Sequence, residues 1–154
     1  MHGFLNSSDR IVFNDPGHGA AIGTLAGARF MPGTDVAIAR VLRHNLLGGV
    51  ILTDYTGESI AMHTASWVRH WVNRDLVFAV FDYPFNQLEV KRIFGRLPET
   101  NEQAHSFNLH CGFRDVARVE GVYEHNVAQI VMRLDREDCR FFGIKPLRVR
   151  SNLD

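Results

Sequence analysis

The fold of this chain is best read from one stretch, Asn101-Glu102-Gln103-Ala104-His105-Ser106-Phe107-Asn108-Leu109-His110-Cys111-Gly112-Phe113. Thr100 and Asn101 are both residue types that cap a helix N-terminus, and Glu102 places a negative charge in the first turn, where the helix dipole favours it. Gly112 suits the left-handed position just after a helix end. The stretch therefore predicts a short helix that ends at Gly112 and leads into a strand.

Length and composition limit the kind of protein this can be. The chain has 154 residues, so we predict a single domain over residues 1–154. Basic and acidic residues number 17 each, which leaves no excess of positive charge for a phosphate backbone. No apolar run approaches the roughly 20 residues that span a bilayer, and the N-terminus lacks the pattern of a signal peptide. We therefore expect a cytoplasmic protein with neither nucleic acid nor membrane as a partner.

Cysteine and histidine usage gives no metal or redox motif. Cys111 and Cys139 have neither metal spacing nor a disulfide framework, so both are expected to be buried, reduced thiols. The eight histidines form no HExxH or comparable ligand set, and we expect no metal. Ser66 and Cys111 also lack the motifs that surround a catalytic nucleophile.

The N-terminal half predicts a strand, a helix and an antiparallel meander. Arg10–Phe13 is β-prone, and His18–Met31 has apolar residues at helical spacing, although glycines weaken it. Three β-prone runs separated by turns follow, namely Val36–Leu42, Leu47–Thr53 and Ser59–Ser66. Strands that follow one another through short turns pair antiparallel.

The middle of the chain predicts a βαβ unit. From Asn73 to Phe85 most positions are apolar, which predicts a buried helix that Pro84 kinks or ends. Glu89–Phe94 then predicts a strand, and strands joined through a helix run parallel.

The C-terminal part predicts a closing hairpin. Its strands are Phe113–Tyr123 and Val127–Leu134, and the tail from Arg136 to Asp154 is expected to pack on the sheet before a polar end. The fold class is therefore α/β (α+β), with a mixed, mostly antiparallel sheet, a central βαβ unit and flanking helices.

The spacing Asn101-x-x-Ala104, followed by Gly112-Phe113, resembles the signature of the last helix and next strand in the GNAT superfamily of N-acetyltransferases. The predicted element order also looks like the GNAT fold. Asp54-Tyr55 with Ser59–Met62, and the run Phe81–Phe85, resemble the small phage- and prophage-type members. The resemblance implies transfer of an acetyl group from acetyl-CoA to a primary amine by direct attack. The acceptor would be a small molecule or a protein amine, and a homodimer is compatible with the sequence.

The resemblance also implies a donor site. In the family the fourth strand diverges from the fifth, and its backbone binds the pantetheine arm of coenzyme A like an added strand. The positions that match are Met62, His63, Thr64 and Ala65 on that strand, Asn101 and Phe107 beside the arm, and the Val72-Asn73-Arg74 turn facing the pyrophosphate.

Two departures from the family pattern affect this site. The family loop Arg/Gln-x-x-Gly-x-Gly/Ala holds the pyrophosphate, whereas Trp67–Arg74 contains no glycine. The family often has a tyrosine as general acid where this chain has Asn108, whose amide could only hydrogen-bond the thiolate while water protonates it. A second interpretation therefore stays open: a non-catalytic GNAT-fold binding or assembly protein with a degenerate coenzyme A site.

The acceptor amine must lose a proton near the thioester, close to the diverging end of the fourth strand. His63 and Glu58 are the titratable side chains nearest that place in the sequence. His63 titrates near neutral pH without tuning, so we rank it first as the general base, with Glu58 second.

Overall fold

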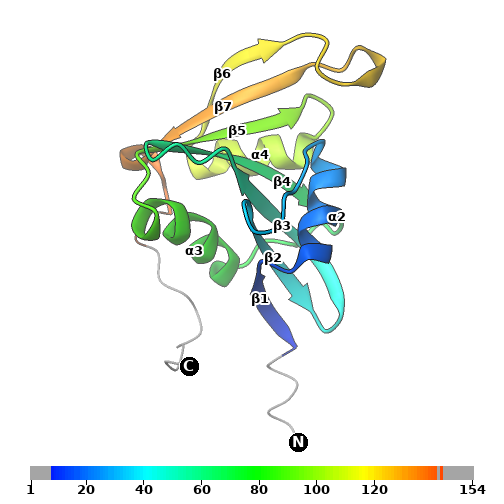
Figure 1. Cartoon of the computed structure of the whole chain (residues 1–154), viewed down its shortest axis with the longest axis vertical. Coiled ribbons are helices and arrows are strands. Elements are labelled where there is room, and N and C mark those ends of the chain that lie inside the picture. Colours follow the sequence, from blue (N-terminus) through cyan, green and yellow to red (C-terminus); the bar gives the residue numbers. More distant parts are fainter. Residues whose placement is uncertain (1–7, 142, 144–154) are drawn as a thin grey trace, which may run out of the picture.

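A seven-stranded mixed sheet organises the chain in the computed structural model, which describes residues 8–141 and 143 (Figure 1). The strand order is β1-β2-β3-β4-β5-β7-β6. The strands are β1 (Asp9–Phe13), β2 (Val36–Leu42), β3 (Asn45–Thr53), β4 (Ser59–Ser66), β5 (Arg92–Pro98), β6 (Arg114–Val119) and β7 (Gln129–Asp135). Only β4 and β5 run parallel, and all other neighbours are antiparallel. The predicted fold class is confirmed.

Within the described residues, three α-helices cover the two faces of this sheet. Helix α2 (Pro16–Ala26) packs through Ile22 and Ala26 on Ala37, Ala39, Ile51 and Ala65. Helices α3 (Arg74–Asp82) and α4 (Glu102–Cys111) share a core with the alternate strand residues Ile38, Val50, Leu52, Ile60 and Met62. Because successive strand residues point to opposite faces, α2 lies on one face and α3 and α4 lie on the other.

Helix α2 is shorter than the predicted His18–Met31. It begins at Pro16, because the Asp15 carboxylate accepts a hydrogen bond from the backbone N–H of His18. It ends at Ala26, because Gly27 is left-handed with φ 76° and its N–H bonds the carbonyls of the last turn. The capping residues Asp15 and Gly27 set the two ends of this helix, and the spacing of its apolar residues did not reveal those ends.

Strand β5 lies further along the chain than predicted. The prediction was Glu89–Phe94, whereas the strand spans Arg92–Pro98. Glu89 has φ 57°, which no strand residue adopts, and β5 is instead defined by its ladder with β7 from Arg92↔Asp135 to Pro98↔Gln129. Pairing with a partner distant in sequence overrides the local β-propensity here.

Helix α3 is capped by Asn73, as predicted, and its α-helical part ends at Asp82. The chain then continues as a π-helical turn, Tyr83–Gln87, which contains Pro84.

Strand β6 is shorter than its predicted range, and strand β7 begins and ends later in the sequence than predicted. Every residue of the edge strand β6 is exposed. The final 3₁₀ turn is Arg136–Asp138, after which Cys139 and Phe141 pack on the core, and the rest of the predicted tail lies outside the described residues.

Candidate active site

Strands β4 and β5 form a gap where they separate. They pair over four positions only, from Ser59↔Arg92 to Met62↔Gly95. Beyond those positions β4 stays paired with β3, while β5 stays paired with β7. The part of β4 from 63 to 66 therefore turns one backbone edge away from β3 into this opening, which we call the β4–β5 gap. The arrangement is the one that the family resemblance led us to expect.

Helix α4 is tied across the gap by its first turn. The Asn101 side chain caps the helix, since its Oδ1 accepts from the N–H of Ala104 at 3.2 Å. The same amide donates from Nδ2 to the backbone carbonyl of Thr64 at 3.1 Å. The Ser66 hydroxyl also donates to the Gln103 side chain. Asn101 thus lies at the gap, with Oδ1 and Nδ2 both bonded within the protein.

Unpartnered buried polar atoms gather at this gap. Among the described residues, the buried side-chain atoms without a hydrogen-bond partner are His18 Nδ1, His63 Nδ1, Thr64 Oγ1 and Asn108 Oδ1. His63 and Thr64 belong to the part of β4 that no longer pairs with β5. Asn108 belongs to α4 and lies over Gly95, where an added Cβ would be 2.8 Å from the Asn108 side-chain nitrogen. Burying polar groups without partners is costly, so such atoms call for a ligand or water. A polar arm threaded through the gap fits this requirement.

His63 is held by a chain of hydrogen bonds that reaches β5. Its Nε2 lies 3.1 Å from the hydroxyl of Thr53, which donates to the Asp54 carboxylate at 3.0 Å. Arg96 donates to the same carboxylate oxygen at 3.1 Å. Since the one hydroxyl proton of Thr53 goes to Asp54, the neutral ring donates its proton from Nε2, and Nδ1 carries the free lone pair.

The surroundings of His63 favour the neutral form of the imidazole. Its side chain is buried, with 7% of its surface exposed. Burial lowers its pKa, and the Arg96 guanidinium lowers it further. The backbone carbonyl of Arg96 and the carboxylates of Asp54 and Asp35 act in the opposite direction. A neutral ring with a buried lone pair can accept a proton, which is what a general base requires.

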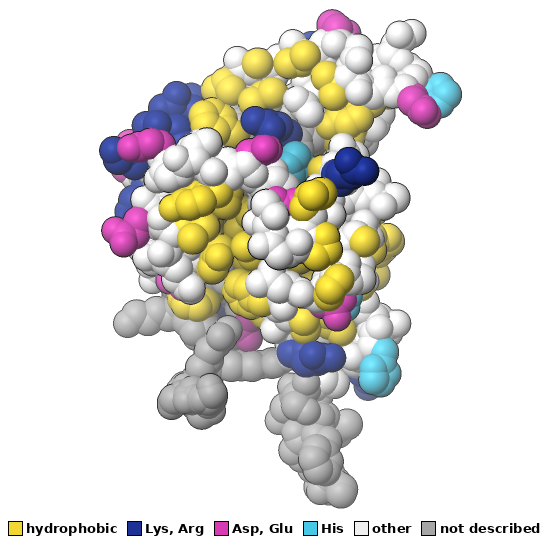
Figure 2. Space-filling model, viewed as in Figure 1, with side chains coloured by type: hydrophobic (Ala, Val, Ile, Leu, Met, Phe, Trp, Pro, Cys, Tyr) yellow, Lys and Arg dark blue, Asp and Glu magenta, His cyan; other side chains and the backbone are white. Residues whose placement is uncertain are grey.

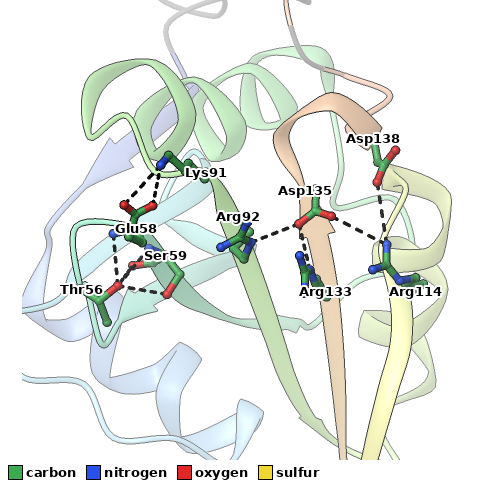
Figure 3. Close-up of polar contacts among 9 residues, drawn as sticks. All are labelled: Thr56, Glu58, Ser59, Lys91, Arg92, Arg114, Arg133, Asp135 and Asp138. Atoms are coloured by element: carbon green, nitrogen blue, oxygen red, sulfur yellow. Dashed lines mark hydrogen bonds and ion pairs between the residues drawn. The ribbon is translucent and has the colours of Figure 1, made fainter.

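Glu58 lies away from the gap. It precedes β4, is exposed, and forms an ion pair with Lys91 at 3.1 Å (Figure 3). It lies five residues before His63, which corresponds to about 16 Å at the usual rise of a strand. The structure therefore does not bring the two predicted base candidates together.

Ion pairs hold the C-terminal strands beside the gap. Asp135 on β7 accepts from Arg133 at 2.9 Å and from Arg92 on β5 at 3.3 Å (Figure 3). The Arg133 and Arg92 guanidinium groups hold the pKa of the Asp135 carboxyl below its usual value. The Arg92–Asp135 pair joins β5 to β7 at the position where β5 also begins to pair with β4.

A cavity of about 420 Å³ lies where α3 begins beside α4. It brings together the predicted pyrophosphate turn and Phe107, and its lining residues are Val72, Asn73, Arg74, Val77, Phe107, His110 and Phe141. Arg69 and His70, the other basic residues of the Trp67–Arg74 segment that could neutralise phosphate charge, are exposed and do not line it. Beside it, Trp71 packs on Phe107 with ring centres 4.9 Å apart, in space that Gly48 leaves open.

The start of α3 differs from an open anion site. The Asn73 side chain accepts from the N–H of Leu76 at 2.8 Å, so the chain itself caps this helix. Asp75 places a buried carboxylate in the first turn, at the positive end of the helix dipole. These features oppose binding of a pyrophosphate here in the manner of the family loop, whereas the unpartnered polar atoms lie at the β4–β5 gap.

A larger cavity of about 730 Å³ opens at the end of the sheet where β3 ends and β4 begins, and we call it the His63 cavity. Its lining includes His63 together with Arg29, Asp35, Thr53, Asp54 and Arg96. The sequence did not single out the last four as one group. Asp54 belonged to a predicted turn and Arg96 lay beyond the predicted strand Glu89–Phe94, so only the correct strand positions bring them together.

The structure also bears on a cysteine nucleophile, a metal site and a membrane-spanning helix. Cys111 is buried, and burial raises the pKa of its thiol, as does the nearby Cys139, so it is no nucleophile. Within residues 8–141 and 143, no three His, Cys, Asp or Glu side chains gather as a metal site. In the same part of the chain, no helix has the length and apolar character needed to cross a membrane.

No family model and no curated protein matches the sequence, but solved structures match the fold. Spermidine N-acetyltransferase from Vibrio cholerae in complex with CoA and spermine aligns with a TM-score of 0.60 at 17% identity, over 86% of this chain and 98% of that one. N-acetyltransferase PseH from Campylobacter jejuni aligns with a TM-score of 0.52 at 12% identity, over 68% and 70%. A probable acetyltransferase aligns with a TM-score of 0.55 at 14% identity, and this chain spans 63% of its length. The fold of this chain is therefore that of GNAT-type acetyltransferases, as the sequence predicted.

Proposed function

We propose that this protein is an N-acetyltransferase that moves an acetyl group from acetyl-CoA to a primary amine by direct attack. One observation carries the proposal. In the part of the chain that the structure describes, three of the four unpartnered buried side-chain polar atoms belong to His63, Thr64 and Asn108, at the gap between β4 and β5. A thioester-bearing arm in this gap would supply polar partners to Thr64 and Asn108 from the α4 face, and an amine would reach His63 from the α2 face.

The chemistry rests on positioning and on one proton transfer. His63 Nδ1 takes a proton from the amine, whose nitrogen then bonds to the thioester carbonyl carbon as the carbon–sulfur bond breaks. The resulting imidazolium is stabilised through Thr53 by the Asp54 carboxylate. Asn108 can hydrogen-bond the departing thiolate, and water protonates it, because a thiol with a pKa of about 8.5 is a good leaving group.

The proposed donor site uses the edge of β4 over Met62, His63, Thr64 and Ala65, with Asn101 and Phe107 beside the arm. The Val72-Asn73-Arg74 turn lines the cavity of about 420 Å³ where α3 begins, and the pyrophosphate would pass there. Since the side chains of Asn73 and Asp75 already occupy the start of α3, the proposed site binds coenzyme A mainly through the pantetheine arm and less through the phosphates.

A second candidate function is a non-catalytic binding or assembly module of the same fold. The observation that favours it is the self-capped start of α3 after a segment without glycine. Calorimetric titration with coenzyme A separates the two candidates. Saturable binding of coenzyme A, followed by acetyl transfer to any amine, supports the enzyme. If millimolar coenzyme A gives no heat of binding, the non-catalytic module is the interpretation that remains.

Several expectations from the sequence stay predictions. They are a cytoplasmic location, a homodimer, and a relationship to the small phage- and prophage-type members of the family. The absence of a metal cofactor and of a nucleic-acid partner also stays a prediction. Size-exclusion chromatography with light scattering tests the dimer directly.

A further inference from the structure

The His63 cavity has a buried polar group at one wall. His63 is more than nine-tenths buried, and its Nδ1, which carries the lone pair, has no hydrogen-bond partner among the described residues. The Thr53 hydroxyl holds the other ring nitrogen at 3.1 Å. Of the described residues that line this cavity, His63 is therefore the one with an unpartnered buried nitrogen.

The charges that line the cavity are balanced in sign. The basic side chains are Arg29 and Arg96, and the acidic ones are Asp35 and Asp54. Asp54 already accepts from Arg96, and Asp35 accepts from the N–H of Met31 at 2.8 Å. On the face that Figure 2 draws, Lys and Arg side chains lie close to Asp and Glu side chains. No excess of carboxylates is left for a molecule with several positive charges, and Arg29 would repel it.

Two arginines also provide donors for an acid group. Arg96 uses Nη1 toward Asp54, which leaves other N–H groups of its planar guanidinium for a second acceptor. Arg29 is exposed and lines the same cavity. Arginine binds carboxylates through charge-assisted hydrogen bonds. A carboxylate close to the reacting amine would be held on this side.

Much of the remaining lining is apolar, although the polar residues Thr34 and Gln129 also belong to it. Its apolar members include Val36, Tyr55, Tyr83 and Leu88, together with Leu52 and Ile60, which are almost fully buried in the core. A volume of about 730 Å³ lies within the range of small-molecule sites and exceeds what a small side chain fills. Aromatic and aliphatic surfaces of this kind favour a large apolar group.

We propose that the His63 cavity binds an amino acid with a large apolar or aromatic side chain, and that its α-amino group is the acetyl acceptor. The inference rests on the proposed function and names its acceptor class. In the reaction the amino nitrogen bonds to the acetyl carbon, the carbon–sulfur bond of the thioester breaks, and the amine proton passes to His63. The products are an N-acetyl amino acid and the free thiol, so no further reactant is needed.

A matched pair of acceptors tests this assignment. L-Phenylalanine and phenethylamine share the ring and the amine and differ in the carboxylate, and spermidine serves as the polycation. With acetyl-CoA as donor, we expect kcat/KM for phenylalanine to exceed that for phenethylamine at least tenfold, with spermidine below both. The acetylated products are identified by mass spectrometry.

Substitution of Arg29 adds a second readout. Arg29→Gln should lower kcat/KM for phenylalanine about tenfold and leave that for phenethylamine within twofold. Arg43→Gln makes the same charge change in the β2–β3 turn, at the opposite end of β3, and should alter neither value. Thermal unfolding of both variants controls for folding.

The outcomes separate the two proposals. Preferred acetylation of spermidine, or an equal loss for both amines in Arg29→Gln, overturns the amino acid acceptor while the acetyltransferase stands. Binding of coenzyme A without acetylation of any tested amine also overturns the acceptor class. Absence of coenzyme A binding overturns both proposals together.

Discussion

The side-chain amide of Asn101 donates a hydrogen bond to the backbone carbonyl of Thr64 at 3.1 Å, and this bond joins the start of α4 to β4 beyond its pairing with β5. The same side chain caps α4 through the N–H of Ala104. One residue therefore sets both the beginning of the helix and its position over the gap. This explains why an asparagine is needed here in this chain, because aspartate could cap the helix but could not donate to Thr64.

Asn101→Ala should lower the free energy of unfolding by about 1–2 kcal/mol, since it removes a helix cap and a hydrogen bond. We also expect coenzyme A affinity to fall by about 1 kcal/mol if the ligand contacts this side chain. Asn101→Asp keeps the cap, so it should recover part of the stability. Urea unfolding and calorimetric titration measure the two effects, and equal coenzyme A affinity in a folded Asn101→Ala variant would remove Asn101 from the site.

His63→Ala should abolish the acidic limb of the pH profile of kcat/KM and reduce the rate by about 10²–10⁴-fold, as loss of a general base does. Because burial and Arg96 lower the His63 pKa, the wild-type limb should lie below the ordinary value of 6.5. Glu58→Gln is the matched control, since Glu58 is exposed and paired with Lys91. A normal acidic limb in His63→Ala would rule His63 out as the base.

The lowered pKa of His63 also predicts how stability depends on pH. In the unfolded chain the ring binds a proton near its ordinary value of 6.5, whereas the folded chain takes up this proton only at lower pH. The unfolded state therefore binds more protons between these two values, and stability contributed by neutral His63 is lost as the pH falls through this window. Chemical unfolding of wild type and His63→Gln over this range should show a smaller pH dependence in the variant. The same slope in both proteins would contradict it.

The proposed donor site should make few contacts with the nucleotide part of coenzyme A. Asn73 caps the start of α3 and Asp75 lies in its first turn, so the phosphates gain little there. Acetyl-pantetheine should therefore react with kcat/KM within about tenfold of acetyl-CoA, a difference of about 1.4 kcal/mol. A loss of a thousandfold or more would show that the phosphates are bound strongly after all.

Gly95 makes room for Asn108, and adding a methyl group there tests the role of this amide. A Cβ at this position would lie 2.8 Å from Asn108 Nδ2, so Gly95→Ala should cost about 1–3 kcal/mol of stability and displace the amide. In an Asn108→Ala background the same change should cost less, because the clash is gone. Unfolding of the four proteins in this cycle gives the coupling energy, and a value near zero would contradict the contact.

The sequence by itself determined the elements whose signals are local. Asn101 and Gly112 bound helix α4, Asn73 caps α3, and successive β-prone runs specify the β2–β3–β4 meander, because caps, turns and alternation act between residues close in the chain. The tertiary structure alone decided the bounds of β5 and the grouping of His63, Thr53, Asp54 and Arg96. Strand register brings these four side chains from β3, β4, β5 and the turn after β3 into one cavity, and register depends on pairing between distant segments. The polar atoms left unpartnered at the gap have the same origin, since burial and hydrogen bonding follow from packing.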